Sequence, residues 1–333
     1  MSNKNLLSGR DKELQELAEQ YEAAMAENKP FYQDADELAD LADWYGTKKR
    51  YDKAFEIAEY GLKLHPDSTE LMIEYAYLHL DNGKKAKARE IIENLPDTYS
   101  PEAKVVRAHL LLSEGKLDDA EQLLDTIEDK ADLANVVDVS YMYLDMGYPD
   151  KALAWLDPVK EEYSDEEAYI AVVADCLYGK GMTEEAIPLY NRLIDMNPYS
   201  APYWFGLARC HFEEMNFNQA IDACDYALVG DDEFADAYVM KGHCFYQLGN
   251  EDAALEYYQK AEELHGLAPE FIYTYIGLCK VSKGEWKEGY ENLEKAILEN
   301  ETDEIASPIL PSLYANAGPV SYTHLRAHET LRH

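Results

Sequence analysis

The sequence is poor in basic residues and has no long hydrophobic run. It has 30 Lys and Arg residues and 66 Asp and Glu residues, so the formal net charge is −36 at pH 7. Proteins that bind nucleic acid neutralise phosphates with Lys and Arg, and this balance argues against that class. The longest largely apolar stretch, residues 168–178, contains Asp175 and is too short to cross a bilayer. We therefore expect neither nucleic acid nor membrane as a partner.

Signals for export and motifs for catalysis are also missing from the sequence. The first residues, MSNKNLLSGRDKEL, have no apolar stretch of signal-peptide length, which predicts a cytoplasmic location. No glycine-rich phosphate loop, H-E-x-x-H, G-x-S-x-G or C-x-x-C pattern occurs. Acidic pairs such as Asp231 and Asp232 are interpreted as solvated helix ends, because carboxylates are abundant everywhere. We expect no catalytic residue, no metal site and no cofactor.

What the sequence does contain is a repeat of 32 to 35 residues. A small residue marks each unit, and a glycine stands five residues before it in six of the eight units, with Lys49 and Met215 in the other two. The small residues are Ala54, Ala88, Ala120, Ala152, Ala186, Ala220, Ala254 and Gly289. This spacing predicts two amphipathic helices per unit, joined by a tight turn and packed closely where the side chains are small.

The residues between these markers carry a family pattern. In the unit 201–234, Trp204, Leu207 and Ala208 precede Ala220 and Ala227, and this pattern resembles the tetratricopeptide repeat family. The resemblance implies an all-α fold, a right-handed solenoid of about eight helix-turn-helix repeats. Pentatricopeptide repeats have a similar period, but they read RNA, for which this surface lacks Lys and Arg. The expected repeats are 35–68, 69–100, 101–132, 133–166, 167–200, 201–234, 235–269 and 270–303.

The two ends of the chain are expected to differ from the repeats. In residues 1–34, one helical face carries Leu14, Leu17 and Tyr21, which predicts an N-terminal capping helix or, alternatively, a loosely attached one. Residues 304–319 are interpreted as the first helix of a truncated ninth repeat or as a short cap. Residues 320–330 resemble a translated sequencing-library adapter, so we interpret the tail 320–333 as non-native.

Four of the five cysteines recur at one position of the unit. They are Cys176, Cys210, Cys244 and Cys279. The position is typical of a small residue packed inside the helix pair, where a free thiol behaves as a small hydrophobe. Equivalent atoms in neighbouring repeats should lie about 10 Å apart, too far for a disulfide. We expect buried thiols without a structural bond.

The family resemblance implies a binding surface on the first helix of each repeat, which lines the concave face. The ninth position of successive units is Asp43, Tyr77, His109, Tyr141, Asp175, Arg209, His243 and Leu278. We interpret this surface as apolar and aromatic, with few cations. The predicted partner-binding residues are Tyr77, His109, Tyr141, Tyr178, Phe205, Arg209, Phe212, His243 and Tyr246. The alternative for each aromatic residue is packing in the core.

These observations favour a non-catalytic scaffold that binds a partner peptide or helix in the groove. The expected partner is an apolar or aromatic protein segment, with basic character that would complement the net charge of −36. A clamp for a terminal carboxylate, as in chaperone-binding members of the family, is disfavoured because only Arg209 and two histidines are available. Two alternatives stay open: a regulatory or substrate-docking array of a larger enzyme or regulator, and self-association through exposed repeat ends.

Overall fold

A computed structural model of the chain describes residues 8–27, 29–264 and 269–299. Every regular element in these ranges is helical. The chain forms two compact units, residues 1–214 and 215–333. The interpretations of residues 304–319 and 320–333 lie outside the described residues.

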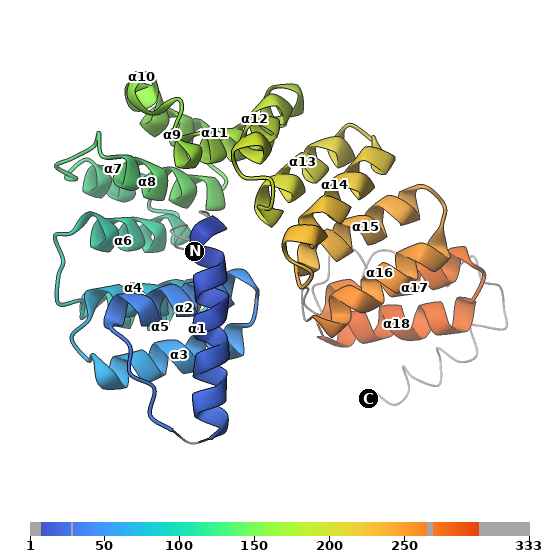
Figure 1. Cartoon of the computed structure of the whole chain (residues 1–333), viewed down its shortest axis with the longest axis horizontal. Coiled ribbons are helices and arrows are strands. Elements are labelled where there is room, and N and C mark those ends of the chain that lie inside the picture. The colour runs from blue at the N-terminus through green and yellow to red at the C-terminus, as the bar shows by residue number, and fades with distance from the viewer. Residues whose placement is uncertain (1–7, 28, 265–268, 300–333) are drawn as a thin grey trace. The chain divides into compact units, whose positions relative to one another are not determined.

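The first unit stacks antiparallel helices, which appear in sequence order from blue to yellow in Figure 1. Within the fourth predicted repeat, the second helix is interrupted after eight residues, where Pro158 lies in a short 3-10 turn, η2 (Asp157–Val159). The helices are α1 (Ser8–Ala26), α2 (Ala35–Thr47), α3 (Tyr51–Leu64), α4 (Thr69–Asp81), α5 (Lys85–Glu93), α6 (Pro101–Ser113), α7 (Leu117–Leu124), α8 (Leu133–Asp145), α9 (Pro149–Leu156), α10 (Lys160–Tyr163), α11 (Glu167–Gly179), α12 (Thr183–Met196) and α13 (Ala201–Glu213).

Side-chain caps fix where four of these helices begin. Asp34 accepts a hydrogen bond from the Glu37 amide at 2.9 Å at the start of α2. Ser68, Ser100 and Asp132 do the same for α4, α6 and α8, at 3.1 to 3.2 Å. Because each cap satisfies an amide that has no partner within the helix, the first residue of the helix is well defined.

The turn inside each helix pair needs one residue in the left-handed region. Six of the turns use glycine at this point, with φ between 68° and 80°. They are Gly83, Gly115, Gly147, Gly181, Gly249 and Gly284. Lys49 and Met215 take the same conformation, at 59° and 57°. Glycine adopts it without a steric penalty from a Cβ atom, so the glycine period in the sequence reflects the geometry of the turn.

Close packing explains the recurring small residues. In the first unit all the recurring alanines, from Ala54 to Ala186, are fully buried. Ser140, which stands where the fourth repeat would have Ala or Gly, is also fully buried, and its hydroxyl donates to the Ala152 carbonyl at 3.2 Å. The buried polar group therefore has the partner that its position requires.

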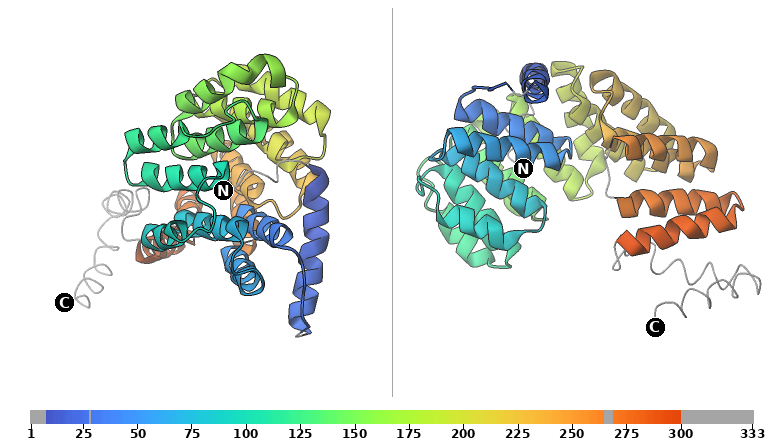
Figure 2. Two further views of the ribbon diagram at one scale, coloured as in Figure 1. Left: turned by 90° about the vertical axis from the view of Figure 1, so that its left-hand side faces the viewer. Right: turned by 90° about the horizontal axis from the view of Figure 1, so that it is seen from below.

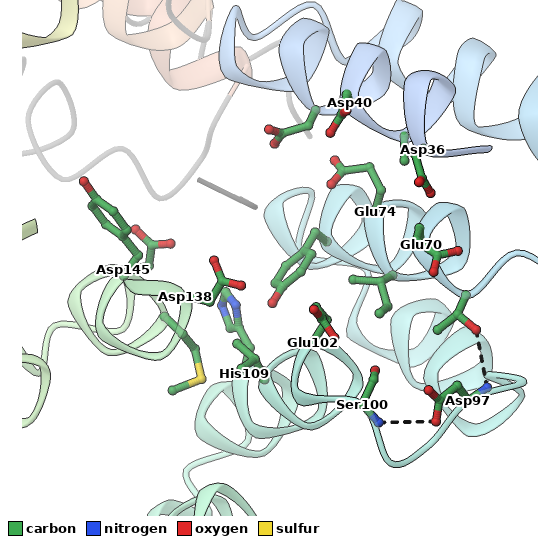
Figure 3. A pocket seen from close by; sticks show the side chains of 18 residues that line it. Asp36, Asp40, Glu70, Glu74, Asp97, Ser100, Glu102, His109, Asp138 and Asp145 are labelled. Atoms are coloured by element: carbon green, nitrogen blue, oxygen red, sulfur yellow. Dashed lines mark hydrogen bonds between the residues drawn. The ribbon is translucent and has the colours of Figure 1, made fainter. Parts of the chain in front are cut away.

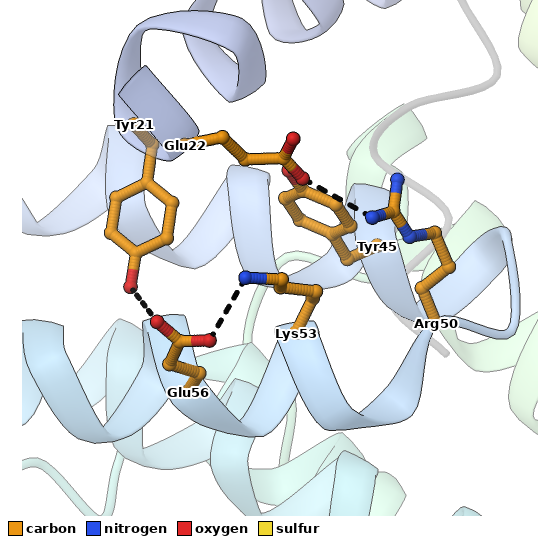
Figure 4. Close-up of polar contacts among 6 residues, drawn as sticks. All are labelled: Tyr21, Glu22, Tyr45, Arg50, Lys53 and Glu56. Atoms are coloured by element: carbon orange, nitrogen blue, oxygen red, sulfur yellow. Dashed lines mark hydrogen bonds and ion pairs between the residues drawn. The ribbon is translucent and has the colours of Figure 1, made fainter. Parts of the chain in front are cut away.

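Helix α1 packs against the first helix pair through both apolar and polar contacts (Figure 4). The fully buried Tyr21 ring lies in the cluster formed with α2 and α3, and its hydroxyl donates to Glu56 at 3.2 Å. Glu22 accepts from the Tyr45 hydroxyl at 2.8 Å and pairs with Arg50 at 3.2 Å. The helix thus packs on the first pair, and its role as a cap stays a prediction.

The second unit contains α14 (Phe217–Gly230), α15 (Ala235–Gln247), α16 (Glu251–Glu263), α17 (Pro269–Ser282) and α18 (Trp286–Glu299). The right-hand view of Figure 2 shows α17 and α18 lying side by side, and the two helices are in contact. The buried Tyr258 ring packs so closely on α15 that a Cβ added to Gly242 would lie 2.5 Å from it. All five cysteine thiols of the chain are buried and free.

Candidate functional site

A cavity of about 330 Å³ lies in the first unit, along the first helices of its first four pairs (Figure 3). Helices α2, α4, α6 and α8 contribute most of its wall, and Asp97 and Ser100 complete it at the start of α6. We call this cavity the acidic pocket. Its lining residues are Asp36, Ala39, Asp40, Asp43, Thr69, Glu70, Ile73, Glu74, Tyr77, Asp97, Ser100, Glu102, Val105, His109, Asp138, Tyr141, Met142 and Asp145.

Carboxylates dominate the acidic pocket. Of the eighteen lining residues within the described part of the chain, nine are Asp or Glu, and none of these eighteen is Lys or Arg. Glu74 is only 5% exposed, and burial together with the charge of Asp43 raises its pKa well above the usual range. Asp145 stays accessible to solvent, but the crowding of protein around it raises its pKa to about 6. The pocket therefore holds its negative charges at an energetic cost.

Three of the predicted binding residues form the aromatic wall of the acidic pocket. Tyr77, His109 and Tyr141 are each largely buried, with one edge on the cavity. The rings of Tyr77 and His109 are tilted at a centroid distance of 5.7 Å. Burial lowers the pKa of His109 to about 4, so its imidazole is neutral at pH 7. The Nδ1 atom of His109 is buried and has no hydrogen-bond partner among the described residues.

Three further predicted residues gather around Asp175 in α11 to α13, and we call this group the Arg209 cluster. The Arg209 guanidinium pairs with Asp175 at 2.7 Å and lies over the Tyr178 ring at 4.4 Å, with Phe205 at 5.6 Å. Tyr190 donates its hydroxyl to Asp175 at 2.7 Å. Tyr141 also donates to Asp175, at 3.4 Å, so it belongs to both sites. Phe212 is half-buried on the same helix as Arg209.

The last two predicted residues lie in the second unit. His243 accepts or donates a hydrogen bond at 2.7 Å through Nδ1 to the Tyr258 hydroxyl, and its ring contacts Tyr275 edge-on at 4.4 Å. Burial lowers its pKa to about 4. Tyr246 is half-buried against the same apolar cluster. His243 is therefore part of a packed aromatic group, which is the core alternative weighed for such positions.

The apolar interpretation of the surface does not hold for the acidic pocket. The sequence analysis followed the ninth position of the repeats, whereas the carboxylates stand mainly at the second and sixth positions. The second position alone gives Asp36, Glu70 and Glu102, one on each of three successive first helices. Reading that position along the array would have revealed the charge.

Among the residues that the structure describes, no group of three or more His, Cys, Asp or Glu is arranged to hold a metal ion. Within the same ranges, no helix combines the length and the apolar character needed to cross a membrane. What the acidic pocket offers is a strongly negative concavity with aromatic walls.

Comparisons with known proteins agree with the repeat pattern. A family profile described as tetratricopeptide repeat matches residues 47–108, and one described as anaphase-promoting complex, cyclosome, subunit 3 matches residues 179–261. A tetratricopeptide repeat protein from Parabacteroides merdae ATCC 43184 superposes with a TM-score of 0.51 at 18% identity, over 74% of this chain and 98% of that one. The chain therefore contains tetratricopeptide-type helical repeats, as the sequence pattern predicts.

Other solved structures resemble parts of this tetratricopeptide-repeat protein more weakly. A thermophilic repeat protein of Thermus thermophilus gives a TM-score of 0.47 at 16% identity, over 55% of this chain and 98% of that one. MamA from Desulfovibrio magneticus RS-1 gives 0.45 at 18%, over 53% and 98%. No curated protein matches the chain. The predicted all-α helical-repeat fold is confirmed, and the predicted repeat boundaries and binding residues stay predictions.

Proposed function

We propose that this tetratricopeptide-repeat protein is a non-catalytic scaffold that binds a partner protein on the first helices of its repeats. The observation that carries the proposal is the acidic pocket, a concavity built by the first helices of four consecutive pairs. Proteins of this repeat type bind protein partners, and the pocket lies on the helices that the family resemblance implies for that purpose.

The size of the acidic pocket favours a short segment of a partner. Its volume of about 330 Å³ is at the lower end of the range for ligand sites, roughly 300 to 1,000 Å³. A side chain and the peptide around it would fill this space, with the remaining contacts spread over the neighbouring first helices. Tyr77 and Tyr141 supply aromatic surface, the residue type that contributes most to binding energy at interfaces.

The experiment blocks the acidic pocket without changing its charge. Ala39 is half-buried on α2 and lines the pocket, so Ala39→Trp would fill part of it. Ala86 is exposed on α5, outside the pocket lining, and Ala86→Trp is the matched control. Peptides selected on the unchanged protein from a random displayed library should bind Ala39→Trp at least about tenfold more weakly.

The control decides how this result is read. Ala86→Trp should bind the selected peptides as the unchanged protein does, and thermal melting should show that both variants are folded. Peptides that bind a folded Ala39→Trp as tightly as the unchanged protein would contradict the proposed site.

A further inference from the structure

We infer that the chain has a second interaction surface, a row of cations at the turns of its first three helix pairs, which binds an acidic segment of a partner protein. This inference goes beyond the proposed function, because none of these cations lines the acidic pocket. We call the surface the basic edge. Its residues are Arg50, Lys84, Lys85, Lys87, Arg89 and Lys116.

One part of this acidic chain is neutral. Residues 48–116 contain 12 Lys or Arg and 12 Asp or Glu, so the rest of the chain carries the whole net charge of −36. Four of the twelve acids line the acidic pocket: Glu70, Glu74, Asp97 and Glu102. Positive and negative charges are therefore segregated within this segment.

The basic residues of the segment gather at the turns inside the helix pairs. The six residues that follow the left-handed Gly83, 84–89, include four Lys or Arg and no acid. The equivalent six residues of each later repeat include at most one Lys or Arg. The residue directly after the left-handed position is Arg50, Lys84 and Lys116 in the first three turns and is never basic afterwards. Because equivalent positions of stacked repeats line up, these three cations form a row.

The row occupies a helix position at which cations are unfavourable. Arg50, Lys84 and Lys116 are the N-cap residues of α3, α5 and α7, and none of them makes a side-chain cap hydrogen bond. N-caps are usually Ser, Thr, Asp or Asn, and the partial positive charge of a helix N-terminus favours acids. The first turn of α5 contains no acid. Helix stability therefore does not account for the row.

Three carboxylates form ion pairs with four cations of the basic edge. The pairs are Arg50 with Glu22 at 3.2 Å (Figure 4), Lys87 with Glu90 at 3.0 Å, and both Arg89 and Lys116 with Glu114. The side chains of these four cations are 39% to 52% exposed. Ion pairs at such exposure contribute little to stability, so their cations stay accessible to a further acid.

The other two cations of the edge have no carboxylate within ion-pair distance among the described residues. Lys84 lies over the Phe55 ring at 5.4 Å, and Lys85 donates a hydrogen bond to the Ser113 carbonyl. Burial and the charge of Lys84 lower the pKa of the neighbouring His79. With six cations and three paired carboxylates, the basic edge is net positive.

Charge complementarity favours a short acidic segment as the occupant of the basic edge. Salt at physiological concentration screens charges beyond about 8 Å, so a short segment would interact mainly with the edge itself. A nucleic acid or a membrane surface would extend over the acidic remainder of the chain. The turns of neighbouring repeats should lie about 10 Å apart, which an extended segment spans in about three residues. Acidic residues three positions apart could therefore contact successive turns.

The experiment is a calorimetric titration with a defined probe. The probe is a peptide of four aspartates, each followed by two alanines, acetylated at the N-terminus and amidated at the C-terminus. Its control is the same peptide with asparagine in place of aspartate. The edge variant combines Arg50→Gln, Lys84→Gln and Lys116→Gln, one change at each turn. If this variant does not fold, Lys84→Gln with Lys116→Gln replaces it, because both residues are exposed.

A matched variant controls for the overall charge of the protein. Lys130→Gln, Lys160→Gln and Arg192→Gln also remove two Lys and one Arg, from exposed positions outside the basic edge. We expect the aspartate peptide to bind the edge variant at least about tenfold more weakly, and the control variant within about twofold of the unchanged protein. The asparagine peptide should bind the unchanged protein at least about tenfold more weakly than the aspartate peptide. Ala39→Trp should bind the aspartate peptide within about twofold of the unchanged protein.

Each other result overturns the inference in a distinguishable way. Equal weakening in both charge variants would show a dependence on the overall charge alone. Equal affinity for the two peptides, or no binding of the aspartate peptide, would reject recognition of acids. Loss of binding in Ala39→Trp but not in the edge variant would place the peptide in the acidic pocket. A single-stranded thymidine oligonucleotide that binds more tightly than the aspartate peptide, and that loses affinity in the edge variant, would assign the edge to nucleic acid.

Discussion

The acidic pocket and the Arg209 cluster share the ninth position of the repeats, yet they differ in how their charges are paired. In the Arg209 cluster, Asp175 and Arg209 are 23% and 28% exposed and form an ion pair at 2.7 Å. Tyr190 donates its hydroxyl to Asp175, and the Arg209 guanidinium lies over the Tyr178 ring. In the acidic pocket, Glu74 is almost completely buried, next to other acids. One site is internally complete, and the other concentrates charge of one sign around a cavity.

This difference indicates which of the two sites should contribute to the stability of the fold and which should contribute to binding. A site that supplies both charges contributes to the fold and offers little to a ligand. A site that keeps like charges together weakens the fold, and that cost is tolerated where a partner can offset it. Substitutions of the same type should therefore have opposite effects in the two sites.

The largest expected effect concerns the packing behind the Arg209 cluster. A Cβ atom on Gly206 would lie 2.2 Å from the ring of the buried Tyr190. The hydroxyl of Tyr190 donates a hydrogen bond to Asp175. Gly206→Ala should therefore lower the free energy of unfolding by about 3 kcal/mol in urea denaturation. The comparison is Gly46→Ala on α2, where the nearest atom is the Leu78 Cδ2 at 3.2 Å and the change should stay within about 1 kcal/mol. Equal losses would contradict the packing argument.

The second-largest effect is expected when one charge of the ion pair between Asp175 and Arg209 is removed. Asp175→Asn leaves the guanidinium of Arg209 partly buried without its carboxylate. We expect a loss of about 2 kcal/mol in the free energy of unfolding, measured with the same denaturant. Asp150→Asn is the control, because its pair with Lys180 at 2.7 Å is exposed and should contribute less than about 0.5 kcal/mol. If the two variants were equally stable, the Arg209 cluster would be no more than a surface contact.

The same chemical change should have the opposite sign in the acidic pocket. Glu74→Gln keeps the shape of the side chain and removes a buried carboxyl group whose ionisation is disfavoured by burial and by the charge of Asp43. The free energy of unfolding at pH 7 should rise, on the order of 1 kcal/mol. Asp118→Asn, an exposed change of equal charge, should have almost no effect. A destabilised Glu74→Gln would mean that the carboxylate is paired within the fold.

The smallest effect is a pH dependence. The folded protein raises the pKa of Asp145 from 3.8 to about 6, so the folded state binds this proton more tightly than the unfolded state. The stabilisation that the proton on Asp145 contributes is complete below about pH 4, and it is lost as the pH rises through about 6. Lowering the pH from 7 to 5 should therefore stabilise the fold, by about 0.5 kcal/mol after solvent screening of this accessible group. Asp145→Asn should reduce this gain, and an unchanged pH profile would contradict the assignment.

The sequence predicted the fold better than it predicted the site. A backbone or packing requirement at a single position explains each of the turn glycines, the buried alanines and the cysteine period. These patterns can therefore be recognised in the sequence alone. The carboxylates of the acidic pocket are different. Asp36, Glu70 and Glu102 look like ordinary solvated helix residues in an acidic chain, and only the stacking of three helices brings them to one cavity.

Two other features also depended on the structure. The partnership of Asp175 with Arg209 joins residues 34 positions apart, and the ninth-position series did not distinguish such a pair from two separate groove residues. The break after α9 follows from Pro158, whose ring ends a helix that the repeat period alone would continue.

The most direct test of the account places a cation inside the acidic pocket. Tyr77→Arg puts a guanidinium at the repeat position that Arg209 occupies beside Asp175, and Tyr77→Gln is the neutral control at the same buried site. The account predicts that the Arg variant unfolds at a higher urea concentration than the Gln variant, because the guanidinium lies among the carboxylates of the pocket. An Arg variant that is no more stable than the Gln variant would contradict the claim that the pocket concentrates negative charge at a cost to the fold.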